Sequence, residues 1–180
     1  MDELHLREVQ LPDLRYLADA PDSVRELALW YCRSLTSLAG LESQAGSLTK
    51  LNLMHDWGTG HDIPLEGLDS LEALTALRVD ESTWQFEADI RAITRLPRLR
   101  RLQLGFPGRV PREVPSWVRD IPHLTDLYVW HVKGRLDLRH LAGAENLTVH
   151  VKRWTRVVGA DLLGPGSSLV TVARDASLGW

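Results

Sequence analysis

Short apolar units recur along the chain, each with apolar residues at its first, fourth and sixth positions. Alternation of this kind predicts a β-strand with one buried face. The clearest units run over residues 48–56, 74–79, 99–104 and 124–129, and their fourth-position leucines are Leu51, Leu77, Leu102 and Leu127. These leucines are separated by 26, 25 and 25 residues, a period typical of a leucine-rich repeat. The pattern therefore predicts an α/β fold, a leucine-rich-repeat solenoid of about seven repeats, with parallel strands on the concave face and short α or 3₁₀ returns on the convex face.

The same form extends toward both ends of the chain. Strands are predicted near residues 3–7, 26–30, 50–54, 76–80, 101–105, 126–130 and 146–151, within a repeat domain over 1–151. In the last of these units we align Leu147 with Leu127, an interval of 20 residues, which places Thr148 beside Tyr128. Residues 152–180 break the pattern and are predicted to form a carboxy-terminal cap with a further strand near 168–173, because the last repeat must cover an open apolar face. No comparable cap precedes Leu4, so we expect that upstream residues were removed or form none.

Apolar residues at helical spacing predict the returns between the strands. The best helix covers residues 86–96, with Phe86, Ile90, Ile93 and Leu96 on one face and Pro97 after its end. Shorter turns of α or 3₁₀ helix are predicted over 35–41, 65–74 and 136–143. A return over 115–122, bracketed by prolines, is expected to turn Trp117 and Ile121 inward.

Composition narrows the setting of this fold. Leucine occupies 32 of the 180 positions and phenylalanine only 2, so we expect a core built from leucine ladders. The single cysteine, Cys32, excludes an intramolecular disulfide, which favours a reducing cytoplasm. The amino terminus has neither a basic leader nor an apolar signal, and no stretch approaches the roughly 20 apolar residues of a membrane span. We therefore expect a cytoplasmic protein with no membrane partner.

Charge is unevenly distributed along the chain, although the net charge is only −3. Residues 61–90 hold eight acidic side chains against Arg78 alone, and residues 91–119 hold eight arginines against Glu113. Because consecutive repeats stack side by side, the two blocks are expected to form neighbouring stripes that neutralise each other. The arginines are predicted on helix, loop and concave positions alike, so one phosphate track cannot contact them all. Nucleic-acid binding is therefore not favoured.

Motifs for catalysis or cofactor binding are not found. The segment 164–168 lacks the lysine of a nucleotide-binding loop, and no nucleophile elbow is present. His55, Asp56, His61 and Asp62 form two His-Asp pairs that could converge on a metal, but a polar loop turned by glycines explains them as well. We predict no catalytic residue, no cofactor and no metal, and the metal alternative at this loop stays open.

Residues between the ladder leucines are the candidates for function. If Leu51 and Leu53 point inward, the fifth and seventh positions of each unit point to the concave face. Aromatic residues, which are enriched in binding hot spots, gather at these positions and at the eighth position. The predicted ligand-binding residues are Trp30, Tyr31, Asn52, Met54, Arg78, Asp80, Arg101, Gln103, Phe106, Tyr128, Trp130 and His131.

Three segments carry a family resemblance: the Leu-x-x-Leu-x-Leu units, the return Leu-Ala-Gly-Leu-Glu over 38–42, and the tail Arg-Val-Val-Gly-Ala-Asp-Leu-Leu-Gly over 156–164. Together they resemble the carboxy-terminal leucine-rich repeats of actinobacterial NACHT-type STAND NTPases, bacterial relatives of NOD-like immune receptors. In that family a central ATPase module switches and oligomerises, and the repeats sense a ligand or hold the module inactive. The ATPase motifs are absent here, so the resemblance implies a sensor module of such a protein and carries no catalytic residue over to this chain.

These observations favour a non-enzymatic recognition domain that binds a protein ligand, for which a phage protein is one candidate. The expected anchors on the concave face are Trp30, Tyr31, Met54, Tyr128 and Trp130. The alternative is an intramolecular role, in which the repeats pack against an upstream NTPase module of the same protein and regulate it.

Overall fold

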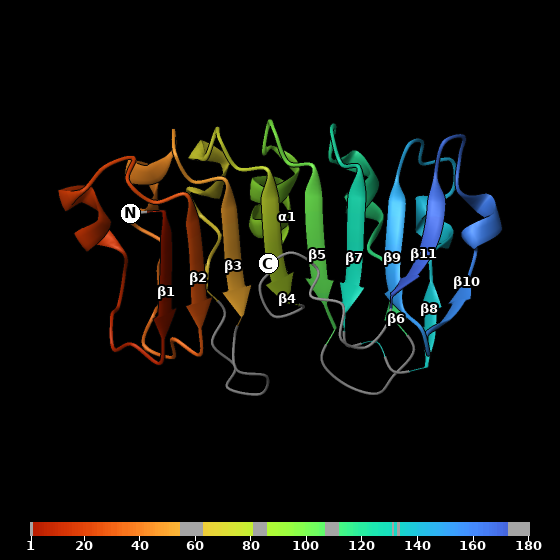
Figure 1. The fold of residues 1–180 in the computed structure, drawn as a ribbon, viewed down its shortest axis with the longest axis horizontal. Helices are drawn as coiled ribbons and strands as arrows, with labels where there is room; N and C mark the ends of the chain where they lie inside the picture. Colours follow the sequence, from red (N-terminus) through yellow and green to blue (C-terminus); the bar gives the residue numbers. More distant parts are fainter. Residues whose placement is uncertain are drawn as a thin grey trace.

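The computed structural model describes residues 2–54, 63–80, 86–106, 112–130, 132 and 134–172. Its main element is a parallel sheet in which the strands follow the order β1-β2-β3-β4-β5-β7-β9-β11 (Figure 1). These strands are β1 Glu3–Arg7, β2 Glu26–Trp30, β3 Lys50–Met54, β4 Ala76–Asp80, β5 Arg101–Gly105, β7 Asp126–Trp130, β9 Thr148–Lys152 and β11 Ser168–Val172. The predicted fold class, a leucine-rich-repeat solenoid with parallel strands, is confirmed.

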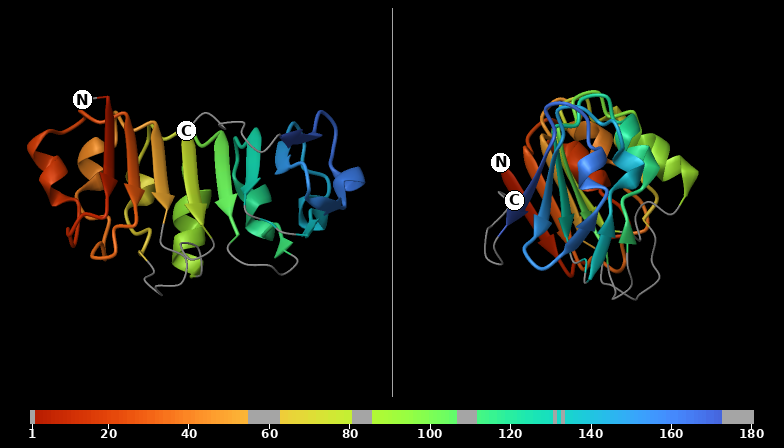
Figure 2. Two further views of the ribbon diagram at one scale, coloured as in Figure 1. Left: turned by 60° about the horizontal axis from the view of Figure 1, so that its bottom comes forward. Right: turned by 90° about the vertical axis from the view of Figure 1, so that its right-hand side faces the viewer.

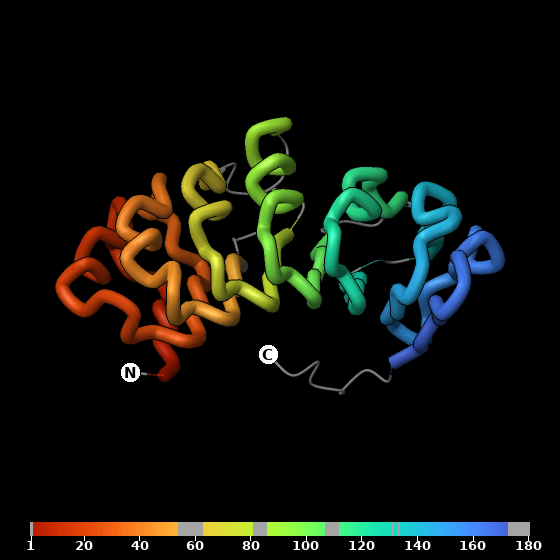
Figure 3. Tube along the Cα trace, turned by 90° about the horizontal axis from the view of Figure 1, so that it is seen from above, coloured from red at the N-terminus to blue at the C-terminus, as the bar shows by residue number. Residues whose placement is uncertain are grey.

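The returns pack behind the strands and give the solenoid its curvature. The strands line the inner side of a shallow arc and the returns line its outer side, where α1 projects furthest (Figure 3). An end-on view shows the same two layers (Figure 2). The returns are α1 Glu87–Thr94 and the 3₁₀ helices η1 Arg15–Asp19, η2 Leu41–Gln44, η3 Leu68–Ser70, η5 Ser116–Asp120, η6 Arg139–Leu141 and η7 Ala160–Leu162.

A leucine ladder between strands and returns forms the core. Leu51, Leu77, Leu102 and Leu127 are neighbours in register across β3, β4, β5 and β7, and each is fully buried. Because side chains alternate along a strand, the second buried residue lies two positions later, as at Leu53. Each repeat therefore buries its apolar side chains against those of its neighbours rather than within itself.

Threonine at the second position of several units joins successive repeats. The hydroxyl of Thr49 donates to the carbonyl of Arg25 (3.1 Å), that of Thr75 to Thr49 (3.1 Å) and that of Thr125 to Arg100 (3.2 Å). These bonds run just before β3, β4 and β7, where the chain enters the sheet. They explain why threonine follows the first leucine of these units.

A buried glutamine organises the second return. Gln44 at the end of η2 is fully buried, and its side chain spans four backbone groups. Its Oε1 accepts from the N–H groups of Ser23 (2.9 Å) and Val24 (3.0 Å). Its Nε2 donates to the carbonyls of Leu17 (3.0 Å) and Ala20 (2.9 Å). The amide thus ties η2 to the preceding repeat with all of its hydrogen-bonding capacity used.

The last repeats differ from the expected alignment by two residues. Val149, not Leu147, pairs with Leu127, so Thr148 lies beside Asp126 and His150 beside Tyr128. The alternating apolar residues at 147, 149 and 151 fit either register, because a shift of two keeps the same side chains on the buried face. Our placement of Thr148 beside Tyr128 was wrong for this reason.

The segment beyond residue 151 contains another repeat rather than only irregular structure. β11 pairs with β9 and extends the main sheet, while β10 Arg156–Val158 joins β8 Arg135–Asp137 and β6 Arg112–Glu113 in a small parallel sheet on the return side. The division into repeats and cap at residue 151 stays a prediction.

Two expected returns are corrected in detail. The segment 136–143 begins in strand β8 and becomes helical only at η6, because the descending chain pairs there with its neighbours. In the predicted helix over 86–96, Ile93 and Leu96 are buried but Phe86 is 58% exposed, since it precedes the first turn of α1. Trp117 and Ile121 do point inward, with 8% and 5% exposure.

The acidic and basic blocks meet on the convex side. Glu87 and Arg91 form an ion pair of 3.0 Å within α1, and Asp89 accepts from the N–H of Leu65 (2.8 Å). The ion pair thus joins successive turns of α1, and the Asp89 hydrogen bond attaches α1 to the preceding return.

Candidate functional site

The strand register arranges the concave side chains in three rows that cross the sheet. The first row contains Glu3, Glu26, Lys50, Ala76, Arg101, Asp126 and Thr148. The middle row contains His5, Ala28, Asn52, Arg78, Gln103, Tyr128 and His150. The third row contains Arg7 and Trp30 on β1 and β2, and Asp80, Gly105 and Trp130 on β4, β5 and β7. Because they alternate with the buried ladder, these side chains face away from the core.

The amino-terminal part of this face surrounds a small cavity of about 80 Å³. It is lined by side chains from β1, β2 and β3, among them His5, Trp30 and Asn52. The rings of His5 and Trp30 lie 5.7 Å apart. The indole Nε1 of Trp30 is buried and has no hydrogen-bond partner among the described residues. Glu26 and Lys50 form an ion pair in the first row beside the cavity.

Three polar side chains form the centre of the face. Asn52, Arg78 and Gln103 are direct neighbours in the middle row, on β3, β4 and β5. Asn52 is 5% exposed and Gln103 is 2% exposed. Burial lowers the pKa of the Arg78 guanidinium, and the nearby Asp80 carboxylate opposes this effect only in part.

The carboxy-terminal part of the face is a set of stacked rings and cations. Tyr128 and His150 stack with centroids 4.1 Å apart and an interplanar angle of 7°. The guanidinium of Arg101 lies 5.7 Å from the Tyr128 ring, and His150 Nε2 lies 3.1 Å from a carboxylate oxygen of Asp126.

Trp130, in the third row, contacts a second cation. The Lys152 ammonium lies 3.8 Å from the centroid of the Trp130 ring. A cation held over a ring keeps the aromatic surface in a fixed orientation. Both Trp130 and Lys152 are partly exposed, so this surface is accessible.

Eight of the predicted site residues have described side chains and lie in the concave rows. They are Trp30, Asn52, Arg78, Asp80, Arg101, Gln103, Tyr128 and Trp130. Asp80 and Tyr128 are more buried than we expected, with 4% and 8% exposure. Met54 ends β3, but its side chain lies outside the described part of the structure, as does all of His131.

The eighth position behaves differently in two repeats. Phe106 is 3% exposed and belongs to the hydrophobic core, so our placement of it on the accessible face was wrong. It directly follows Gly105 on β5, and alternation turns it inward. Tyr31 has a φ of +55°, which breaks the alternation and leaves its ring partly exposed beside Arg7, at 5.7 Å.

The binding list from sequence missed several residues of the face. His150 and Lys152 were not included, although the alternation places both on the concave side in either register. Glu26, Lys50 and Asp126 stand just before the first buried leucine of their units. The period-two alternation places them on the concave side, so the signal for them was present in the sequence.

Metal and membrane alternatives were also compared with the structure. Within the described ranges, no group of three or more His, Cys, Asp or Glu side chains could hold a metal ion. The loop that prompted the metal alternative, residues 55–62, lies outside those ranges. None of the helices in the described part of the chain is long and apolar enough to cross a membrane.

Comparisons with known proteins add little beyond the fold. No protein-family model matches the chain, and no curated protein matches it. Among solved structures, the chain is similar to a crystal structure of internalin C2 (inlC2) from Listeria monocytogenes str. 4b F2365 at 1.90 Å. That similarity has a TM-score of 0.39 and 14% sequence identity, and it covers 91% of this chain and 96% of that one. The assignment as a leucine-rich-repeat protein rests on the leucine ladder and the parallel register of this chain itself.

Proposed function

We propose that this chain is a non-enzymatic recognition domain that binds a protein ligand on its concave face. The observation that carries the proposal is the set of partly exposed aromatic and charged groups on that face. Trp30 and Trp130 stand on either side of the polar centre, and each is partly exposed. Aromatic anchors beside buried polar groups are the usual composition of a protein-binding hot spot.

Nucleic acid is a less suitable ligand for this surface. Glu26, Asp80 and Asp126 lie in the same rows as the cations, so the face does not form one positive track. Several other arginines lie elsewhere, for example Arg91 on α1. The mixed charge is better suited to a protein surface, which offers both signs.

A capture experiment tests the proposal. The immobilised chain is incubated with lysates of uninfected and phage-infected bacterial cells, and bound proteins are identified by mass spectrometry. The double variant Trp30→Ala with Trp130→Ala should lose the captured ligand. The matched control is Trp154→Ala, because Trp154 is 68% exposed but lies outside the three rows. Equal capture by the double variant and the wild type would rule out the concave face as the binding site.

The family resemblance extends the proposal to the role of this domain. We propose that the repeats are the ligand-sensing part of a cytoplasmic NACHT-type NTPase with an antiviral or signalling role. The expected observation is a nucleotide-binding ATPase domain encoded upstream in the same reading frame. A reading frame that encodes only these repeats would contradict this role, but it would leave the concave binding site unaffected.

The intramolecular alternative is tested in the same full-length protein. If the repeats hold the ATPase module inactive, their removal should raise the basal ATPase rate without any ligand. If they act only as a sensor, ligand should change the rate in the intact protein and have no effect after the repeats are removed.

A further inference from the structure

The centre of the concave face contains buried amides with unused hydrogen-bonding capacity. Asn52 and Gln103 flank Arg78 in the middle row. Asn52 Oδ1 and Gln103 Oε1 are buried and have no hydrogen-bond partner among the described residues. Native structures pair nearly all such groups, so two unpaired amide oxygens in one row call for an explanation.

The same chain satisfies a buried amide completely where the role is structural. Gln44 is as buried as Gln103, yet its amide binds four backbone groups. The contrast shows that this fold can satisfy a buried glutamine. The unpaired groups of the centre are therefore better explained by a ligand than by poor packing.

Charge at the centre is compensated only in part, by the Asp80 carboxylate near Arg78. Within the described residues, neither Arg78 nor Arg101 forms an ion pair with a carboxylate, whereas Lys50 pairs with Glu26 and His150 with Asp126. The Arg101 guanidinium lies over the face of the Tyr128 ring, 5.7 Å from its centroid. Burial also lowers the pKa of the Arg78 guanidinium.

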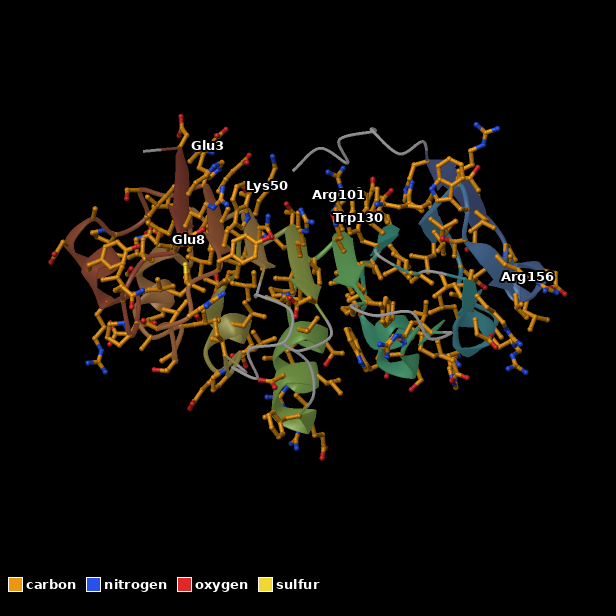
Figure 4. The ribbon with its side chains drawn as sticks, turned by 90° about the horizontal axis from the view of Figure 1, so that it is seen from below. Glu3, Glu8, Lys50, Arg101, Trp130 and Arg156 are labelled. Atoms are coloured by element: carbon orange, nitrogen blue, oxygen red, sulfur yellow. The ribbon has the colours of Figure 1, made fainter. Side chains whose placement is uncertain are left out.

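Arg78 and Arg101 stand on neighbouring strands, in adjacent rows of the concave face. Arg101 pairs in register with Ala76, which stands two residues before Arg78 on β4. In the first row, the methyl group of Ala76 is therefore the side chain between Arg101 and Lys50. Lys50 and Arg101 project from the strand layer on the side away from the returns (Figure 4). A small group from a ligand could therefore approach Arg78 and Arg101 together.

We propose that this centre, Asn52, Arg78, Arg101 and Gln103, binds an acidic side chain on an extended segment of the protein partner. The ligand carboxylate accepts hydrogen bonds from Arg78 and Arg101, since a guanidinium fork matches a carboxylate. On binding, the segment displaces the side chains that cover Asn52 and Gln103, and its backbone N–H groups beside the acidic residue donate to the oxygens of these two amides. Trp30 and Trp130 then contact the residues before and after it. This inference rests on the proposed function and deepens it by naming the chemistry of the ligand.

Selection from a displayed library of random dodecapeptides tests the inference on the full chain. Peptides that bind should contain an Asp or Glu. Changing that residue to Asn or Gln should weaken binding about tenfold or more, because hydrogen bonds between charged groups are lost. Arg78→Gln should weaken the wild-type peptide to a similar extent, and Arg78→Lys should weaken it less. The matched control is Arg156→Gln, because Arg156 is exposed on β10 at the far end of the solenoid and should not change affinity (Figure 4).

Each result distinguishes the inference from the proposed function. Peptides that lose binding in the Trp30→Ala, Trp130→Ala double variant but show no acidic preference would overturn the inference and leave the function intact. If no recovered peptide depends on Trp30 or Trp130, both are wrong. If inorganic phosphate or a short DNA duplex displaces the selected peptides from the chain and an added acidic peptide does not, the centre binds a phosphate ligand and the inference is overturned. Unchanged thermal unfolding of Arg78→Gln would confirm that its effect on binding is direct.

Discussion

Two buried glutamines provide a sharp test of how the concave centre is built. Gln103 is 2% exposed, and its Oε1 has no hydrogen-bond partner in the described part of the chain. Gln44 is 0% exposed, and its amide forms four hydrogen bonds to backbone groups. Methionine has nearly the shape of glutamine without its polar atoms. We predict that Gln103→Met and Gln44→Met change the free energy of unfolding in opposite directions.

The magnitudes follow from the hydrogen bonds. Leaving a buried polar group unpaired costs about 1–3 kcal/mol, so its removal in Gln103→Met should stabilise the protein by about 1–2 kcal/mol. Gln44→Met deletes four bonds of about 1 kcal/mol each and leaves four backbone groups unpaired, so it should destabilise by about 3–4 kcal/mol.

Urea unfolding followed by far-ultraviolet circular dichroism measures both changes. The slope of the free energy against urea should be the same for both variants and the wild type, which shows that the same surface is exposed on unfolding. A loss of stability in Gln103→Met comparable to that in Gln44→Met would mean that the Gln103 amide is paired in solution. The inference about the concave centre would then lose its main support.

Two further predictions concern the returns. Gly40 (φ +101°) and Gly67 (φ +84°) both have left-handed backbones. A Cβ added at Gly40 would lie 2.3 Å from the Leu14 carbonyl oxygen, whereas a Cβ added at Gly67 would have no described atom beyond its chain neighbours within 4 Å. Urea unfolding should therefore show a loss of about 1–2 kcal/mol for Gly67→Ala and a clearly larger loss for Gly40→Ala, and equal losses would contradict the clash. Arg139 donates three hydrogen bonds to the Asp137 carboxylate and holds its pKa well below the usual range. The ionised Asp137 carboxylate should stabilise the fold above its unfolded-state pKa of about 3.9, and this stabilisation should be lost as the pH falls below that value. The thermal midpoint should therefore depend less on pH in Asp137→Asn than in the wild type between about pH 4 and 2.

The fold could be predicted from the sequence because its two determinants are both periodic. A buried residue every second position and a leucine every 25 or so residues together specify strands, their spacing and their parallel stacking. Leu77 and Leu102 lie in register as that period requires. The prediction was wrong where periodicity leaves two solutions, as in the last repeat, where Val149 rather than Leu147 pairs with Leu127.

The candidate site could be predicted only in part, because alternation determines the face and not the burial. The sequence places Gln103 on the concave side, but nothing in it shows that this residue is almost completely buried. Backbone dihedrals are equally absent from the pattern. Tyr31 and Phe106 occupy the same position of their repeats, and only the positive φ of Tyr31 separates an exposed ring from a buried one.

The unpaired amides connect stability to function in a way that one variant can reveal. If Asn52 and Gln103 are retained for a ligand, the native protein gives up stability at the place where binding occurs, as is common at functional sites. Gln103→Met should then increase the free energy of unfolding and weaken the selected acidic peptides in the same molecule. Gln44→Met should lower the free energy of unfolding but leave the peptide affinity of the folded protein unchanged, because its amide acts only between two returns. A Gln103→Met protein that is more stable and binds as tightly as the wild type would separate the two effects, and the amide would then have no part in recognition.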